Sequence, residues 1–155
     1  LLLTDVREAV SQLRESGAID LAAALRPLTE RVPSLDIHLQ MDDPLNVEDP
    51  ERAHVLLRCT QEIITNAVRH AGARNLWIQV EREGGEIVID AHDDGIGGEV
   101  DEILPGNGLR GMRERLAQYQ GSLDVSARKG EGFRLRASLP VTTHMMLASG
   151  PQGVN

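Results

Sequence analysis

A long amphipathic segment from Pro50 to Ala71 constrains the fold of this chain more than any other stretch. At about 100° per residue, its apolar side chains fall on one arc that is wide enough to cover a hydrophobic core. A separate stripe carries a carboxylate, a carboxamide, a guanidinium and an imidazole, from Glu62, Asn66, Arg69 and His70. Asn is a poor residue in the middle of a helix because its side chain competes for backbone hydrogen bonds. The stripe is therefore either a solvated helix face or one wall of a binding site.

Length and charge exclude several classes of protein. A chain of 155 residues is long enough for one domain with a substantial core. Its net charge of −8 argues against a general nucleic-acid binder, because binding phosphates calls for a basic surface. The single cysteine, Cys59, excludes an internal disulfide, fits a reducing compartment and is expected to be buried in the long helix. No apolar run approaches the roughly 18–20 residues of a membrane-spanning helix.

The apolar periodicity divides the chain into three parts. Residues 1–16 carry leucines and valines at coiled-coil spacing and predict the C-terminal end of a bundle helix whose remainder lies outside this chain. Residues 17–141 predict the globular domain. Residues 142–155 show no periodicity and are expected to form a loose tail.

Within the globular part, alternating patterns predict strands at 35–39, 75–82, 86–92, 122–127 and 133–139. Helical patterns predict a helix that Asp20 caps, the long helix, and a helix from Arg113 to Gln120. Strands paired as hairpins with helices between them indicate an α+β fold, a two-layer sandwich in which helices cover one face of a mixed, mostly antiparallel sheet. Trp77 falls on the opposite face of its strand from the core and is expected to be a partly covered surface aromatic.

Two glycine clusters follow the long helix, Asp94-Gly95-Ile96-Gly97 after a strand and Gly106 to Met112 before a helix. Each alone is compatible with a turn or a flexible connection. They are not a dinucleotide fingerprint, because no parallel βαβ unit surrounds them. They do suit phosphates, since glycines let backbone amides approach closely and a helix N-terminus attracts anions. An Asp at a strand end can accept a hydrogen bond from an exocyclic amine, and Asn66 offers an uncharged oxygen to Mg²⁺.

In this order, the three motifs resemble those of the ATP-binding catalytic domain of bacterial sensor histidine kinases. That domain belongs to the superfamily shared with type II topoisomerases, heat-shock chaperones and mismatch-repair ATPases. Glu62-x-x-x-Asn66-Ala-x-x-Arg69-His70 looks like its asparagine box, and the two glycine clusters look like its first and second glycine boxes. The resemblance covers roughly residues 18–141 and implies a Bergerat-type ATP-binding fold. The short segment between the glycine boxes is similar to that of the subgroup that pairs with helix-turn-helix response regulators.

The resemblance implies a role for each matching residue. Asn66 would coordinate Mg²⁺, Asp94 would bind the adenine amine, and Arg69 and His70 would face the phosphates. Glu62 would orient a water or act as a base near the γ-phosphate, and is the catalytic candidate. The residues expected to shape the nucleotide pocket and its lid are Gly95, Gly97, Gly106, Gly108, Leu109 and Gly111.

There are two departures from the family pattern. Phe133 stands where the family has a Thr near the adenine. No phosphoacceptor histidine is apparent, because His92, which an acidic residue follows, ends a strand instead of lying on an exposed helix. The resemblance therefore implies a cytoplasmic catalytic half, which is expected to be monomeric. It would transfer the γ-phosphoryl group of ATP to a histidine on the dimerisation domain of a homodimeric parent, for relay to a response regulator. Sensor kinases are often membrane-bound, so an inner-membrane anchor is compatible with the parent protein.

Two other functions remain open from the sequence. One is a serine kinase of the anti-sigma-factor type, against which the N-terminal bundle-like segment argues, since such kinases begin directly with the domain. The other is an ATP-binding module without catalysis. Phe133 leaves that possibility open, whereas Glu62, Asn66 and Asp94 argue against it.

Overall fold

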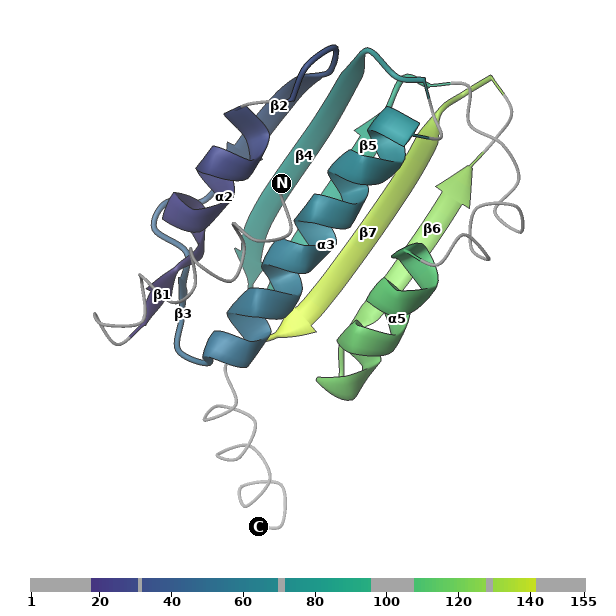
Figure 1. Ribbon diagram of the computed structural model, residues 1–155. Helices are drawn as coiled ribbons and strands as arrows, with labels where there is room; N and C mark the ends of the chain where they lie inside the picture. The colour runs from purple at the N-terminus through teal and green to yellow at the C-terminus, as the bar shows by residue number, and fades with distance from the viewer. Residues whose placement is uncertain (1–17, 31, 70–71, 96–107, 128–129, 142–155) are drawn as a thin grey trace, which may run out of the picture.

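The computed structural model describes residues 18–30, 32–69, 72–95, 108–127 and 130–141. Five strands form one sheet in the order β2-β4-β5-β7-β6 (Figure 1). These strands are β2 (Asp36–Met41), β4 (Asn75–Glu83), β5 (Glu86–Asp93), β6 (Ser122–Ala127) and β7 (Phe133–Pro140). β2 and β4 run parallel, and the other neighbouring pairs are antiparallel. The predicted mixed, mostly antiparallel sheet is confirmed.

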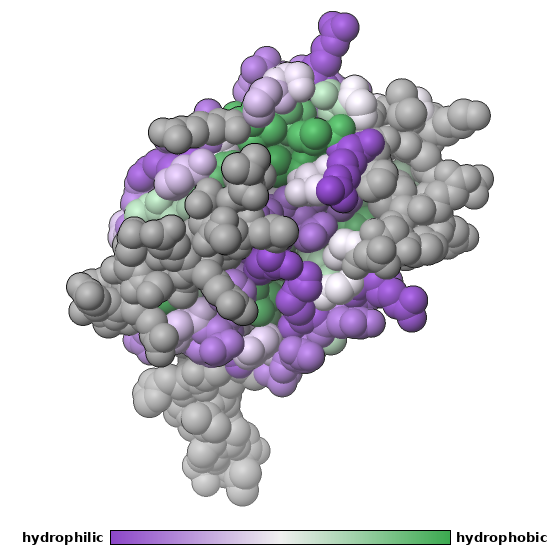
Figure 2. Space-filling model, in the orientation of Figure 1, coloured by the Kyte–Doolittle hydropathy of each residue, from purple (hydrophilic) through white to green (hydrophobic). Residues whose placement is uncertain are grey.

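Three helices lie on one face of this sheet: α2 (Leu21–Glu30), α3 (Pro50–Arg69) and α5 (Gly108–Gln118) (Figure 1). α3 lies over the middle of the sheet because its apolar arc, which includes Leu56 and Ile64, is buried in the core, where the helix packs against β5 and β7. The α+β two-layer sandwich expected from the sequence is therefore confirmed. Figure 2 views this helical side, where hydrophilic side chains surround one hydrophobic area near α2 and the C-terminal half of α3.

A second, two-stranded sheet was not predicted. Its strands, β1 (Ile19–Asp20) and β3 (Asn46–Val47), pair antiparallel beside the start of α2. Strands of two residues are too short to produce an alternating pattern, which explains why they could not be predicted from the sequence. The predicted cap is confirmed, because Asp20 Oδ1 accepts a hydrogen bond from the amide of Ala22 at 3.1 Å.

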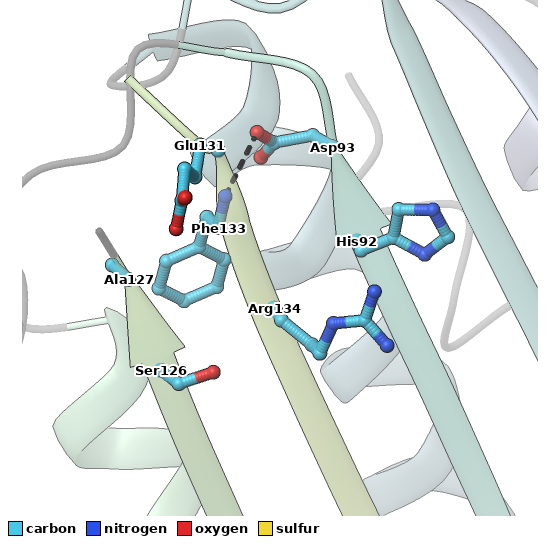
Figure 3. A pocket seen from close by; sticks show the side chains of 8 residues that line it. His92, Asp93, Ser126, Ala127, Glu131, Phe133 and Arg134 are labelled. Carbon is cyan, nitrogen blue, oxygen red and sulfur yellow. Dashed lines mark hydrogen bonds between the residues drawn. The ribbon is translucent and has the colours of Figure 1, made fainter. Parts of the chain in front are cut away.

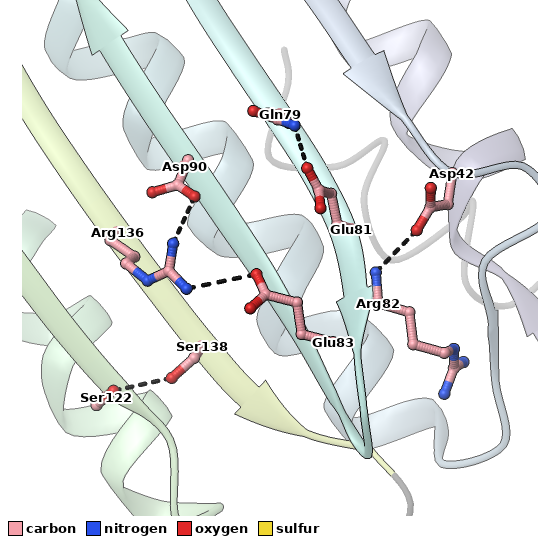
Figure 4. Close-up of polar contacts among 9 residues, drawn as sticks. All are labelled: Asp42, Gln79, Glu81, Arg82, Glu83, Asp90, Ser122, Arg136 and Ser138. Carbon is pink, nitrogen blue, oxygen red and sulfur yellow. Dashed lines mark hydrogen bonds and ion pairs between the residues drawn. The ribbon is translucent and has the colours of Figure 1, made fainter.

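The far face of the sheet is polar. Arg136 on β7 donates to Asp90 on β5 at 2.7 Å and to Glu83 at 3.4 Å, and Ser122 bonds Ser138 at 2.9 Å (Figure 4). Because successive residues of a strand point to opposite faces, these residues alternate with the core residues of the same strands.

Two predictions about single side chains are also confirmed. Trp77 lies on this far face and is 37% exposed. Cys59 lies on the buried side of α3, and burial raises the pKa of its thiol to about 12. No helix within the described part of the chain is long and apolar enough to cross a membrane.

Candidate nucleotide-binding site

The polar stripe of α3 faces α5. The Glu62 carboxylate lies against Gly108, the first residue of α5, and a Cβ at Gly108 would come within 3.0 Å of Glu62 Cδ. The guanidinium of Arg52 on α3 lies 5.0 Å from the centre of the Tyr119 ring, just beyond the end of α5, and so helps to hold the helices together. The structure thus brings together Glu62 and the second glycine box. His70, Gly97 and Gly106 lie outside the described residues.

Asn66 lies one turn after Glu62 on the same stripe and is partly buried. Its Nδ2 atom is buried and has no hydrogen-bond partner among the described residues. A buried amide donor without a partner is uncommon and calls for an explanation. A phosphate oxygen or a bound water is the kind of acceptor that this donor lacks. Arg69, which lies one turn after Asn66 and is the last residue of α3, is exposed.

No cluster of three or more His, Cys, Asp or Glu side chains in the described part of the chain forms a metal cage. Mg²⁺ does not need one, because it usually keeps several waters and binds one or two protein oxygens together with substrate phosphates. The side-chain oxygens of Asn66 and Glu62 are of the type that serves as a ligand to Mg²⁺. The donor set therefore fits Mg²⁺ carried by a nucleotide better than a metal held by protein alone.

α5 begins at Gly108, five residues before the helix start predicted at Arg113. Most of the second glycine box is therefore the first turn of a helix rather than a loop. Leu109 and Met112 are buried at 1% exposure and anchor this turn in the core. The Leu109 side chain thus anchors the helix in the core, and its assignment to the nucleotide pocket stays a prediction. Gly111 lies beside Arg115. A Cβ at Gly111 would lie 3.3 Å from Nη1 of the Arg115 guanidinium.

Two neighbouring aspartates at the end of β5 have opposite surroundings. Asp93, the last residue of the strand, is 5% exposed, and its Oδ1 accepts hydrogen bonds from the amides of Gly95 at 2.9 Å and Phe133 at 3.3 Å (Figure 3). Burial raises its pKa, although both amide bonds oppose that rise. Within the described residues, its Oδ2 makes no hydrogen bond. The two bonds that Asp93 accepts from backbone amides thus both end on Oδ1.

Asp94, in contrast, is exposed, and its carboxylate is occupied. Oδ1 accepts from the amides of Arg74 and Asn75, and Oδ2 accepts from the Asn75 side chain, each at 2.9 Å. The bonds from Asn75 are the main cause that lowers the Asp94 pKa to about 2. These contacts hold the Asp94 carboxylate on β4, where it is not free to bind a base. The carboxylate to which the resemblance assigns the adenine amine is therefore already occupied by Asn75 and Arg74.

The side of the sheet on which Asp93 lies follows from alternation. Ile87, Ile89 and Ala91 point from β5 into the core, and Asp93 continues that series at the end of the strand. The sequence prediction ended this strand at His92, one residue early, so this signal was missed. Asp93 therefore faces the helical layer, to which α3 and its polar stripe belong.

A pocket of about 350 Å³ opens where β5 and β6 end and β7 begins. Asp93 and Phe133 line it together with His92, Ser126 and Arg134, which point to the far face (Figure 3). Gly132 forms its edge at a φ of +82°, and a Cβ there would lie 3.1 Å from the Asp93 carbonyl carbon and nearer still to its oxygen. Only a residue without a side chain allows β7 to approach Asp93 this closely.

Comparisons with known proteins agree with this geometry. Residues 51–143 match the model of the histidine kinase-, DNA gyrase B- and HSP90-like ATPase family. The sensor histidine kinase DesK of Bacillus subtilis is 30% identical over 129 residues, which cover 83% of this chain and 35% of that protein. Sensor histidine kinase YxjM of the same species is 30% identical over 145 residues, which cover 91% of this chain and 35% of its own length. The chain thus spans about a third of these relatives.

Solved structures show the same fold. The Erythrobacter litoralis EL346 blue-light activated histidine kinase superposes with a TM-score of 0.74 at 21% identity, over 91% of this chain and 48% of that one. The family match implies ATP binding and includes α3, Asp93 and the second half of the sheet. The chain therefore belongs to the histidine kinase-, DNA gyrase B- and HSP90-like ATPase family, in the form of the ATP-binding domain that sensor histidine kinases carry.

Proposed function

We propose that this domain binds Mg²⁺-ATP and supplies the γ-phosphoryl group to a histidine on the dimerisation domain of its parent kinase, for relay to a response regulator. The observation that carries the proposal is that the candidate site residues lie together on the helical side of the sheet. Glu62 and Asn66 on α3, the first turn of α5, and Asp93 on β5 all border the same layer. The relatives, which are sensor histidine kinases, support the choice of this activity within the family.

In this proposal the purine base lies at Asp93. Its Oδ1 already accepts two backbone amides, which leaves Oδ2 for the exocyclic amine of adenine. Phe133 contributes its backbone amide, so the missing Thr hydroxyl is not needed to orient Asp93. The adenine contact and its backbone support therefore come from β5 and β7.

The phosphates lie toward α3 and α5 in this proposal. The N-terminus of α5 favours anions, and Asn66 Nδ2 is a donor without a partner. Mg²⁺, when bound, would neutralise developing charge on the phosphates, with the oxygens of Asn66 and Glu62 as candidate ligands. Glu62 also lies where a carboxylate can hold a proton or a water beside the phosphates. Such phosphoryl transfer depends mainly on positioning and charge stabilisation.

Calorimetric titration tests the base contact. We compare ATP with purine riboside triphosphate, which lacks the 6-amino group, on the wild type and on Asp93→Asn. A hydrogen bond to a charged group contributes about 1.5–3 kcal/mol, so Asp93→Asn should weaken ATP roughly tenfold to a hundredfold. The analogue should change much less. Equal weakening of both ligands would remove Asp93 from the base site.

The phosphate side needs a separate test. Asn66→Ala should lose the Mg²⁺-dependent part of ATP affinity. Thr65→Ala, next to it on α3, should keep it, because within the described residues the Thr65 hydroxyl donates to the Gln61 carbonyl of its own helix. Transfer is then assayed with the parent's histidine-bearing domain added in trans, as acid-labile phosphate on that domain. ATP binding without transfer would favour the non-catalytic module.

A further inference from the structure

The carboxylate of Asp94 closes the end of the β4–β5 pair. The Asp94 amide donates to the Asn75 carbonyl at 3.3 Å, which continues the ladder one step beyond the Leu76–Asp93 pair. The side chain then folds back and accepts the amides of Arg74 and Asn75. Asp94, which directly follows Asp93, is thus bound to Asn75, the first residue of β4. The bonds are charge-assisted, since a carboxyl with a pKa of about 2 is ionised at any working pH.

Asn75 extends this connection to the edge strand β2. Its Nδ2 donates to Asp94 Oδ2, and its Oδ1 lies 2.9 Å from Nε2 of His38. Because an amide oxygen can only accept, His38 must carry its proton on Nε2. His38 in turn stacks on Trp77 at 5.4 Å, and Trp77 stacks on His92 at 4.8 Å. The contacts therefore pass from β5 through β4 to β2 and return to the residue before Asp93.

Asp93 is held by different contacts on its other side. Its Oδ1 is fixed by the amides of Gly95 and Phe133, and Gly132 packs against its backbone. These contacts orient the carboxyl only while the backbone at the end of β5 keeps its position. The Asp94 contacts determine where it ends. Loss of those contacts should therefore displace Asp93 without removing any group that Asp93 itself uses.

We propose that Asp94 and Asn75 form a clamp, a hydrogen-bonded pair of positioning residues that fixes Asp93 for recognition of the base. The inference deepens the proposed function and rests on it, because it assumes that Asp93 binds adenine. Neither clamp residue touches the nucleotide. Their pairing is a match of one carboxylate with one carboxamide, and either partner can in principle supply either group.

That symmetry provides the experiment. Asp94→Asn sets two amide donors against each other, and Asn75→Asp sets two carboxylates against each other. Each should weaken ATP and purine riboside triphosphate by the same factor, roughly tenfold, the scale usual for groups that orient a binding residue. The double variant Asp94→Asn with Asn75→Asp restores one donor and one acceptor, and should return both affinities to within about threefold of the wild type.

The matched control is Asp90→Asn. It removes an exposed carboxylate from β5, the strand that Asp94 follows, where Asp90 pairs with Arg136, and it should leave both affinities unchanged. Three results would overturn the clamp: wild-type affinity in both single variants, a double variant no better than the single ones, or selective loss of ATP over the analogue in Asp94→Asn. The last would mean that Asp94 contacts the base itself.

A measurement without ligand separates failure of the clamp from failure of the proposed function. Amide hydrogen exchange at Gly95 and Phe133 reports the two bonds to Asp93 Oδ1. Exchange should accelerate in the single variants and slow again in the double variant. If the wild type binds no ATP, the proposed function fails, and this exchange pattern alone decides whether the clamp exists. Unchanged exchange in the single variants would overturn it.

Discussion

The close approach of β7 to Asp93 predicts that two similar glycines will respond differently to one substitution. Gly130 has a φ of +84° and Gly132 a φ of +82°, so Ala meets the same unfavourable backbone conformation at both. A Cβ at Gly130 has nothing within 4 Å, whereas a Cβ at Gly132 meets the Asp93 carbonyl group. Comparing the two variants therefore separates backbone strain from steric contact.

The expected magnitudes follow from these two terms. The left-handed backbone costs Ala about 1–2 kcal/mol at either position. At Gly132 the obstructing atoms are backbone, which cannot rotate away, and overpacking of this kind adds about 1–3 kcal/mol. Gly132→Ala should thus lower the free energy of unfolding by about 2–5 kcal/mol, and Gly130→Ala by about 1–2 kcal/mol. Because relief requires movement of Asp93, Gly132→Ala should also weaken ATP, while Gly130→Ala should not.

Urea unfolding and calorimetric ATP titration measure both effects on the same preparations. Gly84→Ala is a second control, since Gly84 has a φ of +62°, open space around its Cβ position, and a place at the opposite end of β5. If all three variants lose the same stability and keep ATP affinity, then β7 does not approach Asp93 as closely as described. The reasoning about Gly132 would then be wrong.

Three further predictions concern titration, reactivity and the first turn of α5. Asp94, whose pKa is lowered to about 2, stabilises the fold above the ordinary Asp pKa of about 3.9, and this stability is lost as the pH falls toward 2. Asp93, whose pKa is raised by burial, binds its proton more tightly when folded, so its contribution to stability falls as the pH rises above the ordinary value. In urea unfolding at several pH values, Asp94→Asn should therefore flatten the acid-side loss, and Asp93→Asn should be at least as stable as the wild type near neutral pH. Cys59, with a pKa of about 12 and 1% exposure, should resist a disulfide reagent at pH 8 until urea unfolds the protein, and rapid native labelling would contradict its burial. Gly108→Ala should destabilise the domain little, because Glu62 can rotate away, yet it should weaken ATP by displacing that carboxylate; an unchanged ATP affinity in titration would place Glu62 outside the site.

Most of the fold could be predicted because its elements are long enough to show a period. The nine residues of β4 and the eight of β5 alternate, and the twenty residues of α3 carry both an apolar arc and a polar stripe. β1 and β3, with two residues each, have no period to detect. The parallel pairing of β2 with β4 is a long-range contact that the pattern of either strand alone does not encode. The predicted division into residues 1–16, 17–141 and 142–155 remains a prediction.

The boundaries of elements were harder to predict than their existence, and the site depends on boundaries. α5 starts inside the second glycine box because Leu109 and Met112 continue the apolar stripe of Leu116. Glycines are unfavourable inside helices, so the pattern suggested a loop there. Burial of two large side chains outweighs that local preference. This shift places the Leu109 side chain in the core.

The two aspartates show how a boundary error becomes an error of function. When the end of a strand is placed one residue too early, its last residue is left out of the alternation that assigns side chains to the two faces. Asp93 and Asp94 are chemically identical in the sequence, and only the place where β5 ends distinguishes them. Once Asp93 is the last strand residue, it continues the inward series and becomes buried, which raises its pKa. Asp94 then lies past the sheet, where hydrogen bonds from the Asn75 side chain and from the amides of Asn75 and Arg74 lower its pKa. We propose that Asp93 recognises the base and that Asp94 positions Asp93, and neither assignment can change without the other.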